Sequence, residues 1–110
     1  MSKRYQVAVN MVIMKYQESS VYKIQSLVTD NYFISSTTQR VSQRLKTLKR
    51  NYREYKAGKR EHTAVYDVMD AGDYTHETLE KVQCGSKTEL RRAEREWAHR
   101  MGAADAQRPF

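Results

Sequence analysis

SVYKIQSLVTDNYFISSTTQRVSQRLKTLKRNYREY, residues 20–55, predicts two strands followed by a helix. Its β-prone stretches at 21–27 and 32–36 flank Thr29-Asp30-Asn31, which favours a turn between antiparallel strands. From residue 41 onward the apolar side chains recur at i, i+4, i+7, i+11 and i+14, the spacing of one narrow stripe on a helix. The residues of this stripe are Val41, Leu45, Leu48, Tyr52 and Tyr55. We expect Gly58 to end the helix.

Three further elements are predicted towards the C-terminus. A short helix is expected from about Thr63, as N-cap, to Ala71, with Gly72 in the left-handed turn that follows. Residues 75–82 are a weaker strand candidate, because their alternation of polar and apolar side chains is poor. Ser86-Lys87-Thr88-Glu89 fits a capping box at the start of the last helix. The buried stripe expected on that helix is Leu90, Ala93, Trp97 and Met101. The order β-β-α-α-β-α predicts an α+β domain, a small antiparallel sheet with helices packed against it.

The chain has 110 residues, which is enough for one domain and too few for two ordinary ones. We expect the domain to span residues 19–101. Residues 1–18 are predicted to form an N-terminal arm or an extra strand, because apolar residues alternate there. Residues 102–110 are predicted to form a flexible tail. No apolar run approaches the roughly 20 residues that a membrane span needs, so no membrane partner is expected.

The cysteine content indicates the compartment of the protein, and the charge distribution indicates its class of partner. Cys84 is the single cysteine, so an internal disulfide cannot form and an intracellular location is expected, with an organelle or a virion left open. The net charge is +7, and residues 40–60 hold nine basic residues against Glu54 alone, a net +8. Such a segment favours a nucleic-acid partner, although it could also be a solvated helix face. The residues predicted to follow a phosphate backbone are Arg40, Lys46, Lys49, Arg50 and Arg53.

Two charged residues depart from the pattern of their helices. Glu94 falls inside the apolar stripe of the last helix, where a carboxylate is costly unless it is paired or binds a cation. It is therefore either a partner in a structural ion pair or a metal ligand. Arg44 falls on the margin opposite the basic face of its helix. It either shields the helix or reaches a site beside the sheet. Tyr22, in the first strand, is either an ordinary half-buried side chain or a proton-handling group.

These residues occur in a recognisable order. Ser20-Val21-Tyr22-Lys23-Ile24, then Phe33-Ile34-Ser35, then Arg44-Leu45 and finally Ala93-Glu94 resemble the GIY-YIG nuclease family over roughly residues 20–101. Residues 52–59, followed by Tyr66-Asp67-Val68 and Gly72-Asp73, also resemble its stand-alone and viral or phage-type members. The resemblance implies a three-stranded antiparallel sheet flanked by helices. It also implies hydrolysis of DNA phosphodiester bonds with one divalent ion, Mg²⁺ or Mn²⁺. DNA is thereby favoured over RNA as the partner.

The resemblance also implies a role for three residues. Glu94 would hold the metal ion, which polarises the scissile phosphate. Arg44 would neutralise the charge that grows on the pentacovalent phosphate. Tyr22 would position or deprotonate the attacking water.

At four positions the chain departs from the family pattern. Ser20 and Ser35 stand where the pattern has glycine, Phe33 stands in place of tyrosine, and Leu48 stands where many members carry histidine. A positioned acid or base is typically worth about 10²–10⁴ in rate, so these departures predict a weakened or lost activity. Two functions therefore stay open. One is a GIY-YIG-type endonuclease; the other is a catalytically silent, metal-free nucleic-acid-binding or structural component, with protein partners, of a larger ribonucleoprotein or viral assembly.

Overall fold

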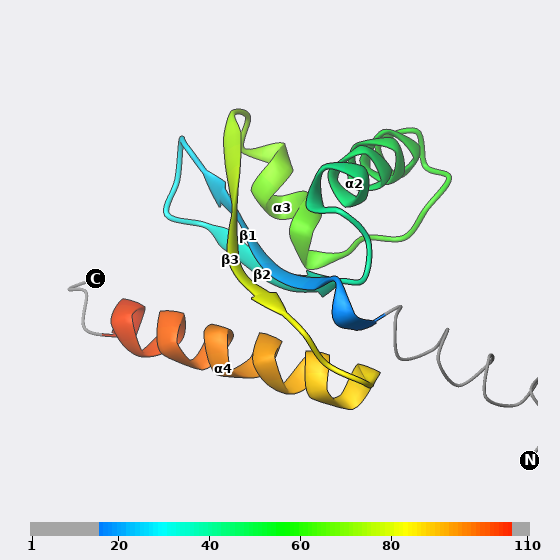
Figure 1. Ribbon diagram of the computed structural model, residues 1–110. Helices are drawn as coiled ribbons and strands as arrows, with labels where there is room; N and C mark the ends of the chain where they lie inside the picture. Colours follow the sequence, from blue (N-terminus) through cyan, green and yellow to red (C-terminus); the bar gives the residue numbers. More distant parts are fainter. Residues whose placement is uncertain (1–15, 107–110) are drawn as a thin grey trace, which may run out of the picture.

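The computed structural model describes residues 16–106, which form a three-stranded antiparallel sheet with helices on both of its faces (Figure 1). The predicted α+β fold class and the predicted order of elements are confirmed. The elements are β1 (Ser19–Ser26), β2 (Tyr32–Thr37), α2 (Val41–Lys56), α3 (Ala64–Asp70), β3 (Tyr74–Val82) and α4 (Lys87–Ala106).

The two predicted end segments fall largely outside the described residues. Of the arm or strand expected over 1–18, only the last three residues are described, and residues 16 and 17 form a helical turn. The prediction of a flexible tail from residue 102 is wrong for residues 102–106, because α4 continues to Ala106. The alanines around Gly102 favour a helix and offset the cost of about 1 kcal/mol that glycine carries in a helix. Residues 107–110 lie outside the described part.

Strand β1 is the centre of the sheet, in the order β2-β1-β3. In the β1–β2 pair, Tyr22 lies opposite Ser35 and Ile24 lies opposite Phe33, and directly opposed residues share a face of the sheet. The hydroxyl of Ser26 stabilises the predicted turn, because it accepts hydrogen bonds from the amides of Val28 (3.1 Å) and Thr29 (2.9 Å). Strand β2 has one neighbour in the sheet and is an edge strand.

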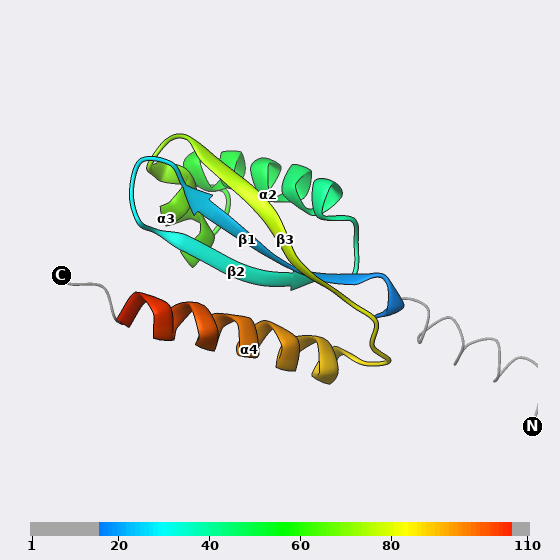
Figure 2. The ribbon, with the colours of Figure 1, turned by 60° about the vertical axis from the view of Figure 1, so that its left-hand side comes forward.

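The main core lies between the sheet and the pair α2 and α3, on the face opposite α4 (Figure 2). It consists of Tyr22, Ile24, Leu45, Leu48, Val65, Tyr66, Val68 and Met69. The predicted stripe of α2 is confirmed: Leu45 and Leu48 are buried, and Val41, Tyr52 and Tyr55 pack against them. A side chain in β1 faces this core or faces α4, depending on its place in the alternation.

The other face of the sheet is covered by α4. Leu90 is buried there, whereas Ala93, Trp97 and Met101 are only half-buried. The predicted cap at the start of the helix is present, because the Ser86 hydroxyl accepts a hydrogen bond from the Glu89 amide at 3.3 Å. The Glu89 carboxylate accepts a hydrogen bond from the amide of Gly85 at 3.0 Å, and not from the Ser86 amide that a capping box would use. This cap determines where α4 begins and therefore which residues of α4 meet β2.

Helix α3 begins after Thr63, as predicted, but the Thr63 side chain forms no capping hydrogen bond. Thr63 is therefore the N-cap residue by position, as predicted, without a capping hydrogen bond from its hydroxyl. The helix has only seven residues, and four of them are buried. Packing against the sheet therefore stabilises the helix without a capping hydrogen bond. Gly72 after the helix has a φ of 111°, in the left-handed region that favours glycine, as predicted.

Candidate functional site

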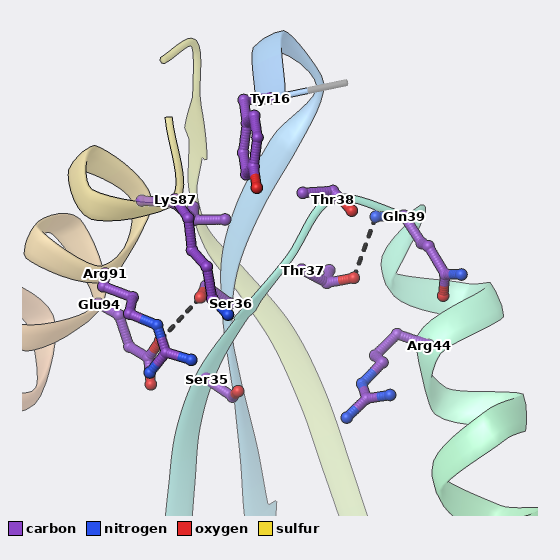
Figure 3. A pocket seen from close by; sticks show the side chains of 11 residues that line it. Tyr16, Ser35, Ser36, Thr37, Thr38, Gln39, Arg44, Lys87, Arg91 and Glu94 are labelled. Atoms are coloured by element: carbon purple, nitrogen blue, oxygen red, sulfur yellow. Dashed lines mark hydrogen bonds between the residues drawn. The ribbon is translucent and has the colours of Figure 1, made fainter. Parts of the chain in front are cut away.

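A polar cleft of about 470 Å³ lies at the C-terminal end of β2, between the first turn of α2 and the first two turns of α4 (Figure 3). Hydroxyl groups of β2 and of the residues that follow it form its floor. Side chains from α2, from α4 and from the turn before β1 form its walls. The lining residues are Tyr16, Ser35, Ser36, Thr37, Thr38, Gln39, Arg44, Lys87, Leu90, Arg91 and Glu94.

The structure brings Arg44 and Glu94 to this cleft from opposite sides of β2. Arg44 comes from α2 on one face of the sheet, and Glu94 comes from α4 on the other face. They share one cleft because β2 is an edge strand, so the cleft wraps around it. Both side chains are half-buried. The two residues that depart from their helical stripes in the sequence thus line the same cleft.

The Glu94 carboxylate is held by a hydrogen bond and not by an ion pair. The Ser36 hydroxyl donates to Glu94 Oε2 at 2.7 Å (Figure 3). Among the described residues, the ion pairs involve other acids, so Glu94 has no basic partner at salt-bridge distance. The alternative of a structural ion pair for Glu94 is therefore wrong for this part of the chain. One carboxylate oxygen stays available to a ligand in the cleft.

Tyr22 does not join Arg44 and Glu94. Its side chain is fully buried, at 0% exposed, within the main core, and its hydroxyl has no hydrogen-bond partner. It is absent from the cleft lining because its place in the alternation of β1 faces it towards the core under α2 and α3. The expectation that Tyr22 lines a site with Arg44 and Glu94 is therefore not met by this structure.

The four positions that depart from the family pattern also separate in space. Ser35 lines the cleft, whereas Ser20 is buried in β1 and borders a separate hollow beside Arg40. Leu48 is a core residue, and Phe33 packs against the same core. Phe33 and Leu48, which stand where the family pattern has tyrosine and often histidine, therefore lie outside the cleft lining.

The basic face of α2 is exposed and distinct from the cleft. Lys46, Lys49, Arg50 and Arg53 of this face are exposed, as is Arg40, the N-cap residue of α2, and none of these five residues lines the cleft. The single acid of the segment, Glu54, is occupied by Arg60, whose guanidinium lies 2.7 Å away. The hydrogen bond from Arg60 lowers the pKa of Glu54. Among residues 16–106, no ion pair involves Lys46, Lys49, Arg50 or Arg53, so their charges can meet an external anion.

Among the lining residues that the sequence did not mark as site residues, three carry a charge or a phenol: Tyr16, Lys87 and Arg91. Lys87, Arg91 and Glu94 follow an i, i+4, i+7 spacing, so helix geometry could have placed the two cations beside the carboxylate. Tyr16 carried no such signal. With Arg44, the cleft presents three cations and one carboxylate. This excess of positive charge suits an anion such as a phosphate group.

The donor set of the cleft also bears on the metal that the resemblance implies. Glu94 is its single carboxylate, and residues 16–106 hold no cluster of three or more His, Cys, Asp or Glu side chains. A closed protein-only metal centre does not fit such a set. Mg²⁺ commonly takes one or two carboxylates and completes its shell with water and substrate phosphate oxygens. The cleft fits that mode of binding, in which Glu94 and a phosphate share the ion.

Comparison with models of known protein families, with curated proteins and with solved structures found no match. In the described part of the chain, none of the helices has the length and apolar character of a membrane-spanning segment.

Proposed function

We propose that this protein is a phosphodiesterase of GIY-YIG type that hydrolyses DNA with one divalent metal ion. The observation that carries the proposal is the meeting of Arg44 and Glu94 in one cleft across the edge strand β2. In the sequence they are 50 residues apart, and each is anomalous on its own helix. A binding site in their shared cleft would explain why both charged residues depart from the apolar stripes of their helices.

The cleft residues divide the chemistry among them. Arg44 neutralises charge that develops on the phosphate, which is the largest electrostatic demand of the reaction. Glu94, oriented by Ser36, would hold the ion, and a bound Mg²⁺ would supply a Lewis acid for the phosphate. Lys87 and Arg91 lie at the rim and bind neighbouring phosphates of the strand.

We expect the reaction to be slow. The cleft lining contains no histidine, and Tyr22 is sealed in the core. Activation of the attacking water by a positioned base is typically worth about 10²–10⁴ in rate, and no such imidazole is present among the lining residues. The expected rate is therefore about 10²–10⁴-fold below that of a comparable site that holds such a base.

A plasmid-nicking assay with Mg²⁺ and with Mn²⁺ tests the proposal. Glu94→Gln and Arg44→Ala should each slow nicking about 10²–10³-fold, because each removes a preorganised group. Matched controls are Glu96→Gln and Arg92→Ala, which make the same changes on the exposed side of α4, outside the cleft. The controls should nick like the parent. Nicking that survives Glu94→Gln would remove the basis of the assignment.

A second candidate function is a catalytically silent nucleic-acid-binding or structural component of a larger assembly. The observation that favours it is the burial of the Tyr22 phenol together with Leu48 in the core, away from the cleft. Failure of the parent to nick with any metal would favour this candidate, provided that binding to DNA or RNA persists and falls steeply with salt. Neutralising Lys46, Lys49, Arg50 and Arg53 together should then abolish the binding.

A further inference from the structure

Tyr16 is the one phenol among the residues that line the cleft. Its ring stands at the wall of the cleft and its hydroxyl is directed inward, towards the space between Lys87 and Thr38 (Figure 3). The residue lies outside the domain limits that the sequence predicts, so no local pattern marks it. Its side chain is half-buried.

The backbone of Tyr16 is tied to the framework that carries the cleft. Its carbonyl oxygen accepts a hydrogen bond from the Ser19 hydroxyl at 2.7 Å. The same oxygen accepts from the amide of Cys84 at 3.4 Å and from its thiol at 3.5 Å. Ser19 and Cys84 are both buried, at 1% and 7% exposed. Tyr16 is thus joined to the connection between β3 and α4, which lies directly before Lys87.

The side chains of the cleft indicate which kind of ligand it binds. Arg44, Lys87 and Arg91 are pure donors and carry positive charge, so the ligand that satisfies them is an anion with several acceptor oxygens. A phenol O–H adds a donor without adding charge. Hydrogen bonds to an ionised acceptor are about twice as strong as those between neutral groups.

We infer that Tyr16 is a phosphate-binding residue of this cleft, which donates its hydroxyl hydrogen to a non-bridging oxygen of the nucleic-acid backbone. The inference rests on the proposed function for the identity of the ligand, but not for the cleavage step. Tyr16 lies outside the family-like motif. Within that motif Tyr22 is buried and Phe33 has no hydroxyl, so neither residue supplies a phenol to the cleft.

Binding of a fluorescein-labelled DNA duplex to the full chain, followed by anisotropy in EDTA over a range of salt concentrations, tests the inference. Tyr16→Phe keeps the ring and should raise Kd about tenfold, the effect of one hydrogen bond to a charged group. The slope of log Kd against log salt should not change, because no charge is lost. Lys87→Gln should instead reduce that slope by about 0.9, the value for one phosphate contact.

Tyr55→Phe is the matched control, since Tyr55 is a half-buried phenol that stacks on Tyr66 away from the cleft. It should bind like the parent, and thermal unfolding should show that both phenylalanine variants are folded. Unchanged binding by Tyr16→Phe overturns the inference. So does a loss that appears only in Tyr16→Ala, because the ring and not the hydroxyl would then contact the ligand.

The inference and the proposed function fail in different ways. If the parent binds DNA but never nicks it, the hydrolysis is refuted, and a tenfold weaker Tyr16→Phe still supports the inference. If the parent nicks DNA and Tyr16→Phe binds and nicks equally well, the inference alone is refuted.

Discussion

Replacing Tyr22 by phenylalanine should stabilise the protein. The Tyr22 side chain is completely buried in the central strand, and its hydroxyl has no hydrogen-bond partner. A buried polar group without a partner costs about 1–3 kcal/mol, because it has lost its hydrogen bonds to water. Phenylalanine keeps the ring and its packing in the core and removes this cost. We therefore expect the free energy of unfolding to rise by about 1 kcal/mol or more, which raises Tm by roughly 4–8 °C per kcal/mol in a domain of this size.

Urea-induced unfolding followed by circular dichroism measures the effect as a higher midpoint at an unchanged m-value. Tyr52→Phe is the control for the same chemical change, because the Tyr52 hydroxyl donates a hydrogen bond to the Asp70 carboxylate. That variant should lose stability. A loss of stability in Tyr22→Phe would refute the reasoning, because it would mean that the hydroxyl is satisfied inside the core.

The same variant tests the place of Tyr22 relative to the cleft. Because Tyr22 does not line the cleft, Tyr22→Phe should nick plasmid and bind DNA like the parent. Suppose that the variant is folded and at least as stable as the parent but does not nick. Tyr22 would then be a residue of the functional site. Stability and activity together therefore separate a core residue from a catalytic one.

Three further predictions concern acid stability, capping and the core. Hydrogen bonds from Tyr52 and Lys56 lower the pKa of Asp70 below its ordinary value of 3.8, so the stability they contribute is present above that pH and is lost as the pH falls through the lowered pKa. Asp70→Asn should therefore flatten the decline of Tm between about pH 5 and pH 2, and an unchanged decline would contradict this. Ser86→Ala should cost about 1 kcal/mol in urea unfolding, because it removes the cap of α4, and a neutral result would show that the cap contributes nothing. Leu45→Ala should cost about 2–5 kcal/mol by the same measurement, since Leu45 is buried in the main core, and a cost below 1 kcal/mol would place it outside the core.

Local chemistry was sufficient to predict the elements. The β-prone stretch of β1, the apolar spacing of α2 and the serine cap of α4 are each contained in a few neighbouring residues, and each is confirmed. The tail was misjudged because Gly102 is a weak helix breaker among alanines. Thr63 is the N-cap residue of α3, as predicted, and burial of this short helix stabilises it without a capping hydrogen bond.

The sequence by itself marked Arg44 and Glu94, because a charge inside or beside an apolar stripe is visible from helical spacing alone. It could not decide which face of the sheet receives α2 and α3 and which receives α4. Because α2 and α3 pack on one face of the sheet and α4 packs on the other, Tyr22 lies in the core. For the same reason Arg44 and Glu94 line one cleft at the edge strand β2. This packing also brings Tyr16 to a cleft whose other wall lies some 70 residues further along the chain. Contacts between layers depend on how the whole chain packs, so only the tertiary structure could assign them.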